Sequence, residues 1–338
     1  MRLYFGIGGE DGLMYVGAAK RVLEVFDAAE FRAFGGVSAG ALVAFALALG
    51  VTPDELAYLV LNIRLENLEF QPDVYRLIEE LGFDSGSKLL SILSEILRGR
   101  LGVDDVTFAE LWARRSVDLE VQSVDLSRGE LVTFSRATEP DMSVLLALRM
   151  STAVPFLFTP VSWRDRLYVD GGLLTQGFRL PAGDEGADVV SVCIQRRPPS
   201  RSPGVEYDIG QYAQDVFFCV VEEQNRYPAS SFLLKQVEQR AEPLFPVEER
   251  RRLLVESGYA QACAWEGLGP REGKTAGEVV LRDDDERGGF RPEAGQQKKG
   301  VEPHSCIEVL DSEDKRSGVE TGSSSTNVGE GVTRRRVS

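Results

Sequence analysis

The chain has 338 residues, of which 43% are hydrophobic and 27% are charged. This length is enough for one large α/β domain or two medium ones, and the composition is that of a soluble protein with a buried core. The formal net charge of −15 argues against nucleic-acid binding and against membrane binding through bulk charge, because an acidic surface repels phosphates.

The sequence carries no sign of secretion or of membrane insertion. The opening residues, "MRLYFGIGGEDGLM", contain no apolar core of a signal peptide, and the most apolar stretch, Gly40 to Val51, is too short to cross a bilayer. The cysteines are far apart and form no CxxC pair, at Cys193, Cys219, Cys263 and Cys306. We therefore expect a cytoplasmic protein with reduced thiols, no signal peptide, no transmembrane helix and no metal site.

The first fifty residues alternate between strand and helix patterns. "RLYFGIGG" predicts a strand that runs into a tight loop, and "GLMYVGAAKRVLEVF" has the apolar spacing of a helix. "FRAFGG" predicts a second strand, and residues 39–49 predict a second, largely apolar helix. This order predicts an α/β fold of three layers, α/β/α, around a mainly parallel central sheet.

The rest of the chain predicts further helices and strands and then a polar tail. Thr52 to Glu55 have the pattern of a helix start, and mostly helical structure is expected from there to Leu111. The patterns then predict a hairpin at 118–134, a helix at 142–151, strands at 166–169 and 187–194, and helices at 208–240 and 247–268. Residues 1–268 are expected to form the folded domain, and the polar residues 269–338 a disordered tail.

One serine lies between the second strand and the second helix. Gly36-Val37-Ser38-Ala39-Gly40 fits G-x-S-x-G in the strand–turn–helix setting of a nucleophile elbow. The N-terminus of the helix supplies N–H groups and a positive dipole end where negative charge develops. The alternative is that these small residues only fill a crowded strand-to-helix junction.

A nucleophilic serine needs a base. The only histidine, His304, lies in the predicted disordered tail, where it is not held within reach of Ser38, so we do not expect a Ser-His-Asp triad. In "RLYVDGGLL", Asp170 ends a predicted strand and is followed by Gly171 and Gly172. Asp170 is the best candidate for the base, although an Asp-Gly pair is also a common turn.

A glycine loop precedes the first helix, with glycines at Gly6, Gly8, Gly9 and Gly12. Backbone N–H groups of such a loop are suited to an oxyanion hole. The alternatives are a phosphate-binding loop and a plain turn, but neither GxxxxGK[ST] nor GxGxxG is present, so we do not expect a nucleotide site.

Several segments together resemble the patatin-like phospholipases, a family of acyl hydrolases. The resemblance is carried by "GGEDGLMYVGAAKRVLE", "FGGVSAGALVAFALALG", "SVDLSRGELVTFS", "LLALRMSTAVPFLFTPV" and "YVDGGLL". Their order and spacing agree with the family from about Leu3 to Leu174, and the helices up to about Leu268 are compatible with it. The resemblance implies a Ser–Asp dyad without histidine, which agrees with the absence of a histidine from residues 1–268.

Carried over position by position, the resemblance implies Ser38 as the nucleophile and Asp170 as the base. It implies an oxyanion hole in the backbone of Gly8, Gly9 and Glu10. The family's motif glycines correspond to Gly12, Gly36, Gly40, Gly171 and Gly172. The sequence departs from the family loop at two positions, where Ile7 replaces a glycine and Asp11 replaces a basic residue.

The implied function is a lipid acyl hydrolase, of phospholipase A, lysophospholipase or related lipase type, which forms an acyl-enzyme and needs no cofactor. The substrate is expected to be a phospholipid or another acyl lipid, with peripheral membrane contact and no nucleic-acid partner. Two alternatives stay open, a catalytically weak lipid-binding or interaction protein on the same fold, and an esterase that acts on substrates other than lipids.

Overall fold

A computed structural model describes residues 1–62, 74–180, 188–195, 231–237, 247–265 and 268. The chain divides into two compact units, Met1–Gly277 and Glu278–Ser338, and all the described residues belong to the first. The predicted tail at 269–338 lies outside the described residues, and its predicted disorder stays a prediction.

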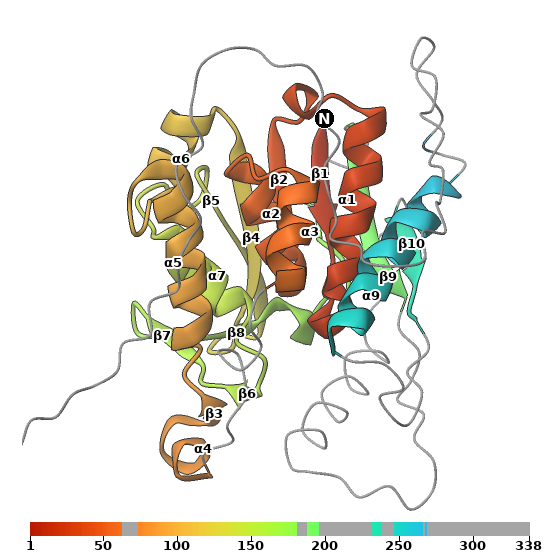
Figure 1. The fold of residues 1–338 in the computed structure, drawn as a ribbon. Coiled ribbons are helices and arrows are strands. Elements are labelled where there is room, and N and C mark those ends of the chain that lie inside the picture. The colour runs from red at the N-terminus through yellow and green to blue at the C-terminus, as the bar shows by residue number, and fades with distance from the viewer. Residues whose placement is uncertain (63–73, 181–187, 196–230, 238–246, 266–267, 269–338) are drawn as a thin grey trace, which may run out of the picture. The chain divides into compact units, whose positions relative to one another are not determined.

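The described part of the first unit is built around a mainly parallel sheet of eight strands, as the sequence predicted (Figure 1). Five neighbouring strands run parallel in the order β10-β9-β1-β2-β4, and β8, β7 and β5 are attached to them in antiparallel fashion. The strands are β1 (Arg2–Phe5), β2 (Ala33–Val37), β4 (Asp118–Asp125), β5 (Glu130–Ser135), β7 (Val161–Trp163), β8 (Arg166–Asp170), β9 (Val189–Gln195) and β10 (Ser231–Lys235).

Helices follow the strands in the alternation that parallel pairing requires. They are α1 (Met14–Val25), α2 (Ala39–Ala48), α3 (Pro53–Asn62), α4 (Val74–Glu80), α5 (Ser87–Leu101), α6 (Phe108–Arg115), α7 (Val144–Ser151) and α9 (Val247–Cys263), with short 3₁₀ turns η1 (Gly9–Leu13), η2 (Ala28–Glu30) and η4 (Gly171–Leu173). The predicted start of α3 is confirmed: the Thr52 hydroxyl accepts a hydrogen bond from the Glu55 N–H, and the Glu55 carboxylate accepts one from the Thr52 N–H.

The two faces of the sheet belong to different clusters of the core. Alternate residues of β1 show this, because Leu3 and Phe5 join the large core formed with the helices, whereas Tyr4 belongs to a smaller cluster. In the smaller cluster the Tyr4 ring stacks on Phe178, with ring centroids 4.1 Å apart, beside Ile7 and Val37. The smaller cluster therefore lies next to the loops that follow β1 and β2.

The strand β4 has an arrangement that matters for the site. Its residues 120–125 pair with β5, whereas 118–122 pair with β2 and 123–125 pair with β8. A strand has only two edges, so β2 and β8 share the edge of β4 opposite β5. They approach each other from opposite directions along that edge, and their carboxyl ends meet where Val37 pairs with Gln122 and Asp170 pairs with Ser123.

The structure corrects the sequence-based prediction at several elements. The helix predicted over 208–240 is wrong at residues 231–235, which form β10 and pair in parallel with β9; the rest of that prediction lies outside the described residues except for 236 and 237. The short strands β3 (Gly82–Asp84), β6 (Phe156–Phe158) and β7 were not predicted, and β3 pairs with β6 in a separate small sheet. The Phe156 side chain at the start of β6 is 54% exposed.

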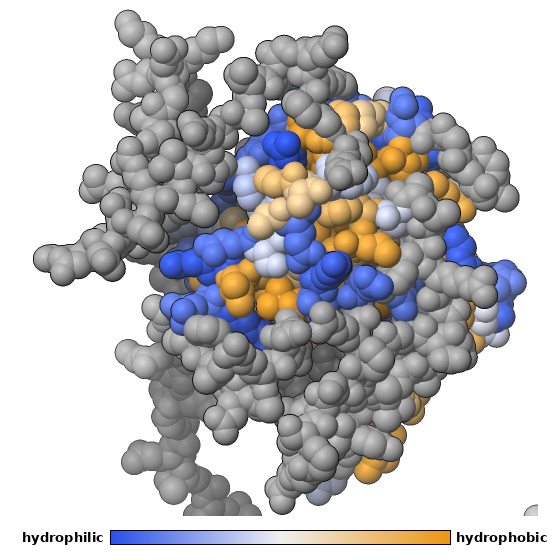
Figure 2. Space-filling model, turned by 90° about the vertical axis from the view of Figure 1, so that its right-hand side faces the viewer, coloured by the Kyte–Doolittle hydropathy of each residue, from blue (hydrophilic) through white to orange (hydrophobic). Residues whose placement is uncertain are grey.

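The surface on the side that carries α9 and β10 mixes hydrophobic and hydrophilic residues (Figure 2). Within the described ranges, no helix has the length and apolarity to cross a bilayer. Of the four cysteines, the structure describes Cys193, which is buried, and Cys263, which is exposed.

Candidate active site at the carboxyl ends of the strands

Ser38 occupies the tight turn between β2 and α2. Its backbone angles are φ 55° and ψ −127°, which are rarely adopted by residues other than glycine, and its side chain does not cap the helix that follows. Such a conformation at the N-terminus of a helix is typical of a nucleophile elbow, because it directs the hydroxyl away from the helix backbone. Ser38 is nevertheless 92% buried.

The motif glycines allow this turn to form. A Cβ at Gly36 would lie 2.3 Å from the carbonyl carbon of Gly40, and a Cβ at Gly40 would lie 2.3 Å from the oxygen of Gly6. A Cβ at Gly12 would lie 2.6 Å from the Ala39 methyl group. The backbones of three segments therefore pack too closely to leave room for a side chain at these glycines. The segments are β2, α2 and the loop after β1.

Asp170 is the last residue of β8 and is almost fully buried. Its Oδ1 atom accepts a hydrogen bond of 2.7 Å from the Gly172 N–H, so one carboxylate oxygen caps the turn η4. A Cβ at Gly171 would lie 2.6 Å from the Val37 side chain, which places the backbone after Asp170 directly against the residue that precedes Ser38. The head-to-head meeting of β2 and β8 thus brings Ser38 and Asp170 to one point of the sheet.

The glycine loop after β1 borders the same point. The Ile7 N–H donates to the Gln176 carbonyl at 3.0 Å, and the Ile7 carbonyl accepts from the Tyr15 hydroxyl at 2.6 Å, so both backbone groups of Ile7 are already used. Gly8 is buried, whereas Gly9, which has φ 52°, and Glu10 are exposed. The backbone of Gly8 to Glu10 thus forms the turn between Ile7 and helix α1.

Asp11, at the position where the family has a basic residue, is buried, and its Oδ2 atom accepts a hydrogen bond of 2.7 Å from the side chain of Gln236. Gln236 follows β10, two strands away from β1 in the sheet. The Asp11 carboxylate therefore accepts a hydrogen bond from the segment that follows β10.

The segment at the end of α7 contacts both candidate catalytic residues. The Ser38 N–H donates to the Ser151 hydroxyl oxygen at 2.9 Å, and the Asp170 N–H donates to the Ala153 carbonyl at 2.9 Å. In the sequence, this segment stands out only through the family resemblance, and no pattern there predicts a role for Ser151. A serine at the end of an apolar helical pattern was the only signal in the sequence.

Gln122 is a second residue near the site for which no sequence pattern predicts a role. Its buried side chain donates to the Arg179 carbonyl at 2.6 Å and accepts from the Arg179 N–H at 2.9 Å, which holds the segment after Asp170 against β4. Its own backbone carbonyl accepts a hydrogen bond of 2.7 Å from the Ser151 hydroxyl.

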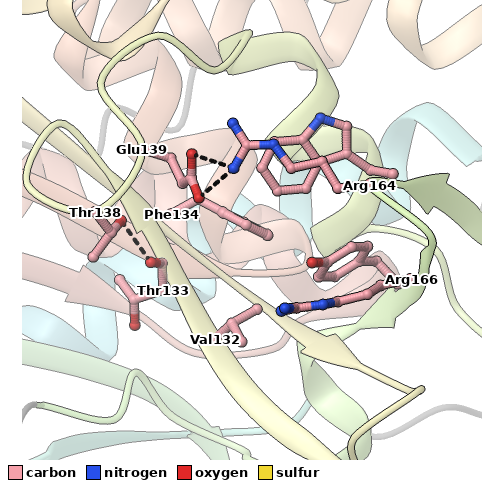
Figure 3. Close-up of a pocket in the computed structure, with 9 residues that line it drawn as sticks. Val132, Thr133, Phe134, Thr138, Glu139, Arg164 and Arg166 are labelled. Atoms are coloured by element: carbon pink, nitrogen blue, oxygen red, sulfur yellow. Dashed lines mark hydrogen bonds and ion pairs between the residues drawn. The ribbon is translucent and has the colours of Figure 1, made fainter.

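A cavity of about 260 Å³ lies between β5, β7 and β8 (Figure 3). The Arg164 guanidinium pairs there with both oxygens of Glu139, at 2.9 and 3.0 Å, and lies 4.1 Å from the centre of the Trp163 ring. None of the site residues predicted from the sequence lines this cavity. Within the described residues, no group of three or more His, Cys, Asp or Glu side chains is arranged to hold a metal ion.

Burial shifts the pKa of two groups in the neighbourhood of the site. Desolvation lowers the pKa of the Arg149 guanidinium to about 10, although Asp84 opposes the shift, and Arg149 binds the backbone of Ser85 and Thr159. Desolvation raises the pKa of the Cys193 thiol in β9 to about 11. Both side chains are buried in the core beside the site, and this burial is the cause of both shifts.

Comparison with known proteins identifies similar sequences and a similar fold. The family model of the patatin-like phospholipases matches residues 3–178, just over half of the chain. Uncharacterized protein R571 of Acanthamoeba polyphaga mimivirus is 29% identical over 168 residues, which make up 49% of this chain and 55% of the relative. Probable lipid hydrolase 463L of Invertebrate iridescent virus 6 is 28% identical over 145 residues, 41% of this chain and 49% of the relative.

The chain therefore spans about half the length of these two relatives. Among solved structures, VipD from Legionella pneumophila superposes with a TM-score of 0.54 at 17% sequence identity, over 78% of this chain and 66% of VipD. At this level of identity the similarity to VipD concerns the fold alone.

Proposed function

The chain belongs to the patatin-like phospholipase family, and from this premise we propose that it is a lipid acyl hydrolase that cleaves carboxylic esters with Ser38 as nucleophile and Asp170 as base. One observation carries the proposal: the carboxyl ends of β2 and β8 meet on β4, so the strained turn at Ser38 adjoins the strand end at Asp170. The description of 463L as a probable lipid hydrolase supports a lipid as the substrate class.

The first half of the proposed reaction forms an acyl-enzyme. The Ser38 oxygen attacks the ester carbonyl carbon while the hydroxyl proton passes to the Asp170 carboxylate. The carbonyl oxygen becomes an oxyanion, which backbone N–H groups of Gly8, Gly9 and Glu10 stabilise. The tetrahedral intermediate then collapses, the bond to the alcohol breaks, and Asp170 returns its proton to the departing alcohol oxygen.

The second half releases the fatty acid. A water molecule attacks the acyl carbon and gives a proton to Asp170, the oxyanion forms again at the same N–H groups, and the bond to Ser38 breaks as its oxygen takes the proton back. Every proton moves between Asp170 and an oxygen atom, so neither histidine nor a metal ion is needed.

The two departures from the family loop are compatible with this proposal. The donors of the proposed oxyanion hole are backbone groups, so the loop does not require a particular side chain at either position. The Asp11 carboxylate is held by Gln236, and the Ile7 side chain belongs to the smaller core cluster with Tyr4, Val37 and Phe178.

The proposal is tested with Ser38→Ala and Asp170→Asn, assayed with p-nitrophenyl esters and with phospholipid micelles. Each substitution should lower hydrolysis by at least about 10³-fold, because it removes the nucleophile or the base. Asp170→Asn keeps an oxygen that accepts the hydrogen bond from Gly172, so its melting temperature should stay close to that of the wild type.

Ser91→Ala is the matched control, because Ser91 lies on the exposed side of α5 and its hydroxyl donates to the Ser87 carbonyl of the same helix. A fluorophosphonate should label the wild type at Ser38 and should not label Ser38→Ala. Full activity in Ser38→Ala would overturn the proposal. Activity on short monomeric esters without activity on micelles would favour an esterase that does not act on lipids, and labelling without turnover would favour a lipid-binding protein.

A further inference from the structure

Ser151 makes two buried hydrogen bonds that connect three elements. Its hydroxyl oxygen accepts from the Ser38 N–H at 2.9 Å, and its hydroxyl proton is donated to the Gln122 carbonyl at 2.7 Å. Ser151 itself is fully buried at the last position of α7. The hydroxyl thus links the turn after β2 to the backbone of β4, and both of its hydrogen-bonding functions are used.

The Ser38 turn needs such a link. A non-glycine residue at φ 55° and ψ −127° persists only where its surroundings hold it in place. The Ser38 carbonyl is held by the Ala41 N–H within α2, at 2.9 Å. On the other side of the residue, the Ser38 N–H is held by Ser151, and without that acceptor a buried N–H would lose its partner.

The same end of α7 also fixes the strand that carries Asp170. Ala153 lies two residues after Ser151, and its carbonyl accepts the Asp170 N–H at 2.9 Å. A change in how Ser38 binds to α7 therefore changes the position of Ser38 relative to Asp170. Proton transfer is sensitive to such a change, because displacements of about 1 Å can cost about 10²-fold in rate.

We infer that Ser151 is a positioning residue for the Ser38 nucleophile: its hydroxyl holds the strained backbone of Ser38 in register with Asp170. The inference rests on the proposed function in so far as it concerns catalysis. Ser151 is placed to act through Ser38 and takes no part in the proton transfers themselves.

The kinetic test compares Ser151→Ala with Ser143→Ala. Ser143 caps the opposite end of α7 by accepting from the Leu146 N–H at 3.0 Å, so its replacement also weakens the helix but leaves Ser38 untouched. In Ser151→Ala, the rate constant for fluorophosphonate labelling of Ser38 and kcat for a p-nitrophenyl ester should both fall about 10- to 100-fold, with KM unchanged within about threefold. In Ser143→Ala, both should stay within about twofold of the wild type.

A second measurement does not depend on activity. Hydrogen exchange of the Ser38 amide, followed by NMR under conditions where both proteins are folded, should be at least about tenfold faster in Ser151→Ala than in Ser143→Ala, because only the first loses the acceptor. If Ser151→Ala does not fold, Ser151→Cys replaces it, since sulfur fills a similar volume but is a weak acceptor. The same two effects are then expected, with a loss of labelling of at least about fivefold.

The outcomes separate the inference from the proposed function. Equal labelling rates in Ser151→Ala and Ser143→Ala, with the wild type reactive at Ser38, would overturn the inference and leave the proposed function standing. If the wild type itself is not labelled, the proposed function fails, and exchange of the Ser38 amide alone decides the inference. Unchanged amide exchange would overturn it in either case.

Discussion

Asp11 illustrates how much a single side chain depends on its partner. At the usually basic position of the loop, a free carboxylate facing the site would oppose a developing oxyanion. Its Oδ2 atom is instead bonded to Gln236, which is 225 residues away in the sequence. The local sequence around Asp11 carries no information about that contact, so only the packing of β10 beside β9 reveals it.

Cys193 leads to a prediction about pH and stability. Burial raises the pKa of its thiol from an ordinary value of 9.0 to about 11, so between these pH values the folded protein holds a proton that the unfolded chain has lost. The free energy of unfolding should therefore be fully retained below pH 9 and should fall as the pH rises towards 11, by up to about 3 kcal/mol. Urea unfolding of the wild type and of Cys193→Ala between pH 8 and 10.5 measures this fall.

The variant Cys193→Ala serves as the reference, because all other titrating groups are common to both proteins. We expect the difference in stability between the two proteins to shrink as the pH rises. A difference that stays constant over this range would mean that Cys193 is not protonated selectively in the folded state.

At the level of elements, the close crossing of α1 and α9 holds α9 in place. A Cβ at Gly17 of α1 would lie 2.0 Å from the Val255 carbonyl oxygen of α9, and a Cβ at Gly258 of α9 would lie 2.0 Å from the Met14 carbonyl oxygen of α1. Each helix therefore rests with its backbone on a glycine of the other. Gly17 lies in the segment "GGEDGLMYVGAAKRVLE", one of those that carry the family resemblance, and the crossing explains why a glycine is needed there.

Gly17→Ala should consequently separate the two helices. Because the overlap is with backbone atoms that cannot move aside alone, we expect a loss of about 2 to 4 kcal/mol in the free energy of unfolding, measured with urea. Helix propensity by itself would favour alanine by about 1 kcal/mol. A loss of stability would therefore mean that the overlap with α9 outweighs the gain in helix propensity.

Gly99→Ala in α5 is the matched control for this substitution. A Cβ at Gly99 meets no atom within 4 Å, so the same change should stabilise the protein by about 0.5 to 1 kcal/mol. If Gly17→Ala were as stable as Gly99→Ala, the crossing of α1 and α9 would be looser than the structure indicates.

At the level of the whole molecule, the net charge of −15 predicts how the proposed lipid hydrolase would respond to the charge of a lipid surface. An acidic protein is repelled by anionic headgroups, and salt screens this repulsion: the Debye length is about 30 Å at 0.01 M and about 10 Å at 0.1 M. Any productive contact with an anionic surface must be made against this repulsion.

Hydrolysis of anionic phospholipid vesicles should therefore increase severalfold when the salt concentration rises from about 10 to about 100 mM. Hydrolysis of zwitterionic vesicles, which lack the repulsion, should change by less than about twofold and serves as the control. A decrease with salt on anionic vesicles would instead point to attraction by a local basic patch.

The sequence was most informative where neighbouring residues decide the structure. The early strands and helices, the hairpin of β4 and β5 and the capped start of α3 were predicted from periodicity and capping residues, and each is confirmed. Strand β10 was predicted as helix, because its five residues lie inside a longer stretch with a helical pattern. Their own preference for strand structure is too weak to show against that pattern. Its pairing with β9 determines its conformation.

The candidate site likewise contains residues that the local sequence predicts and residues that only the fold brings together. The turn at Ser38 and the strand end at Asp170 follow from glycines and β-formers next to each residue, and so the sequence alone was enough to select both as candidates. The roles of Ser151 and Gln122 could not be predicted, because Ser151 is 113 residues from Ser38 and Gln122 is 57 residues from Arg179.

By itself, the amino-acid sequence determined the α/β class, the family resemblance and the two candidate catalytic residues, since these depend on short patterns of neighbouring residues. Only the tertiary structure decided that β2 and β8 meet head to head on β4, that Asp11 is bonded to Gln236 and that Ser151 holds the backbone of Ser38. The physical reason is that these contacts join groups distant in sequence, whose approach is set by the register of the sheet and the packing of α7.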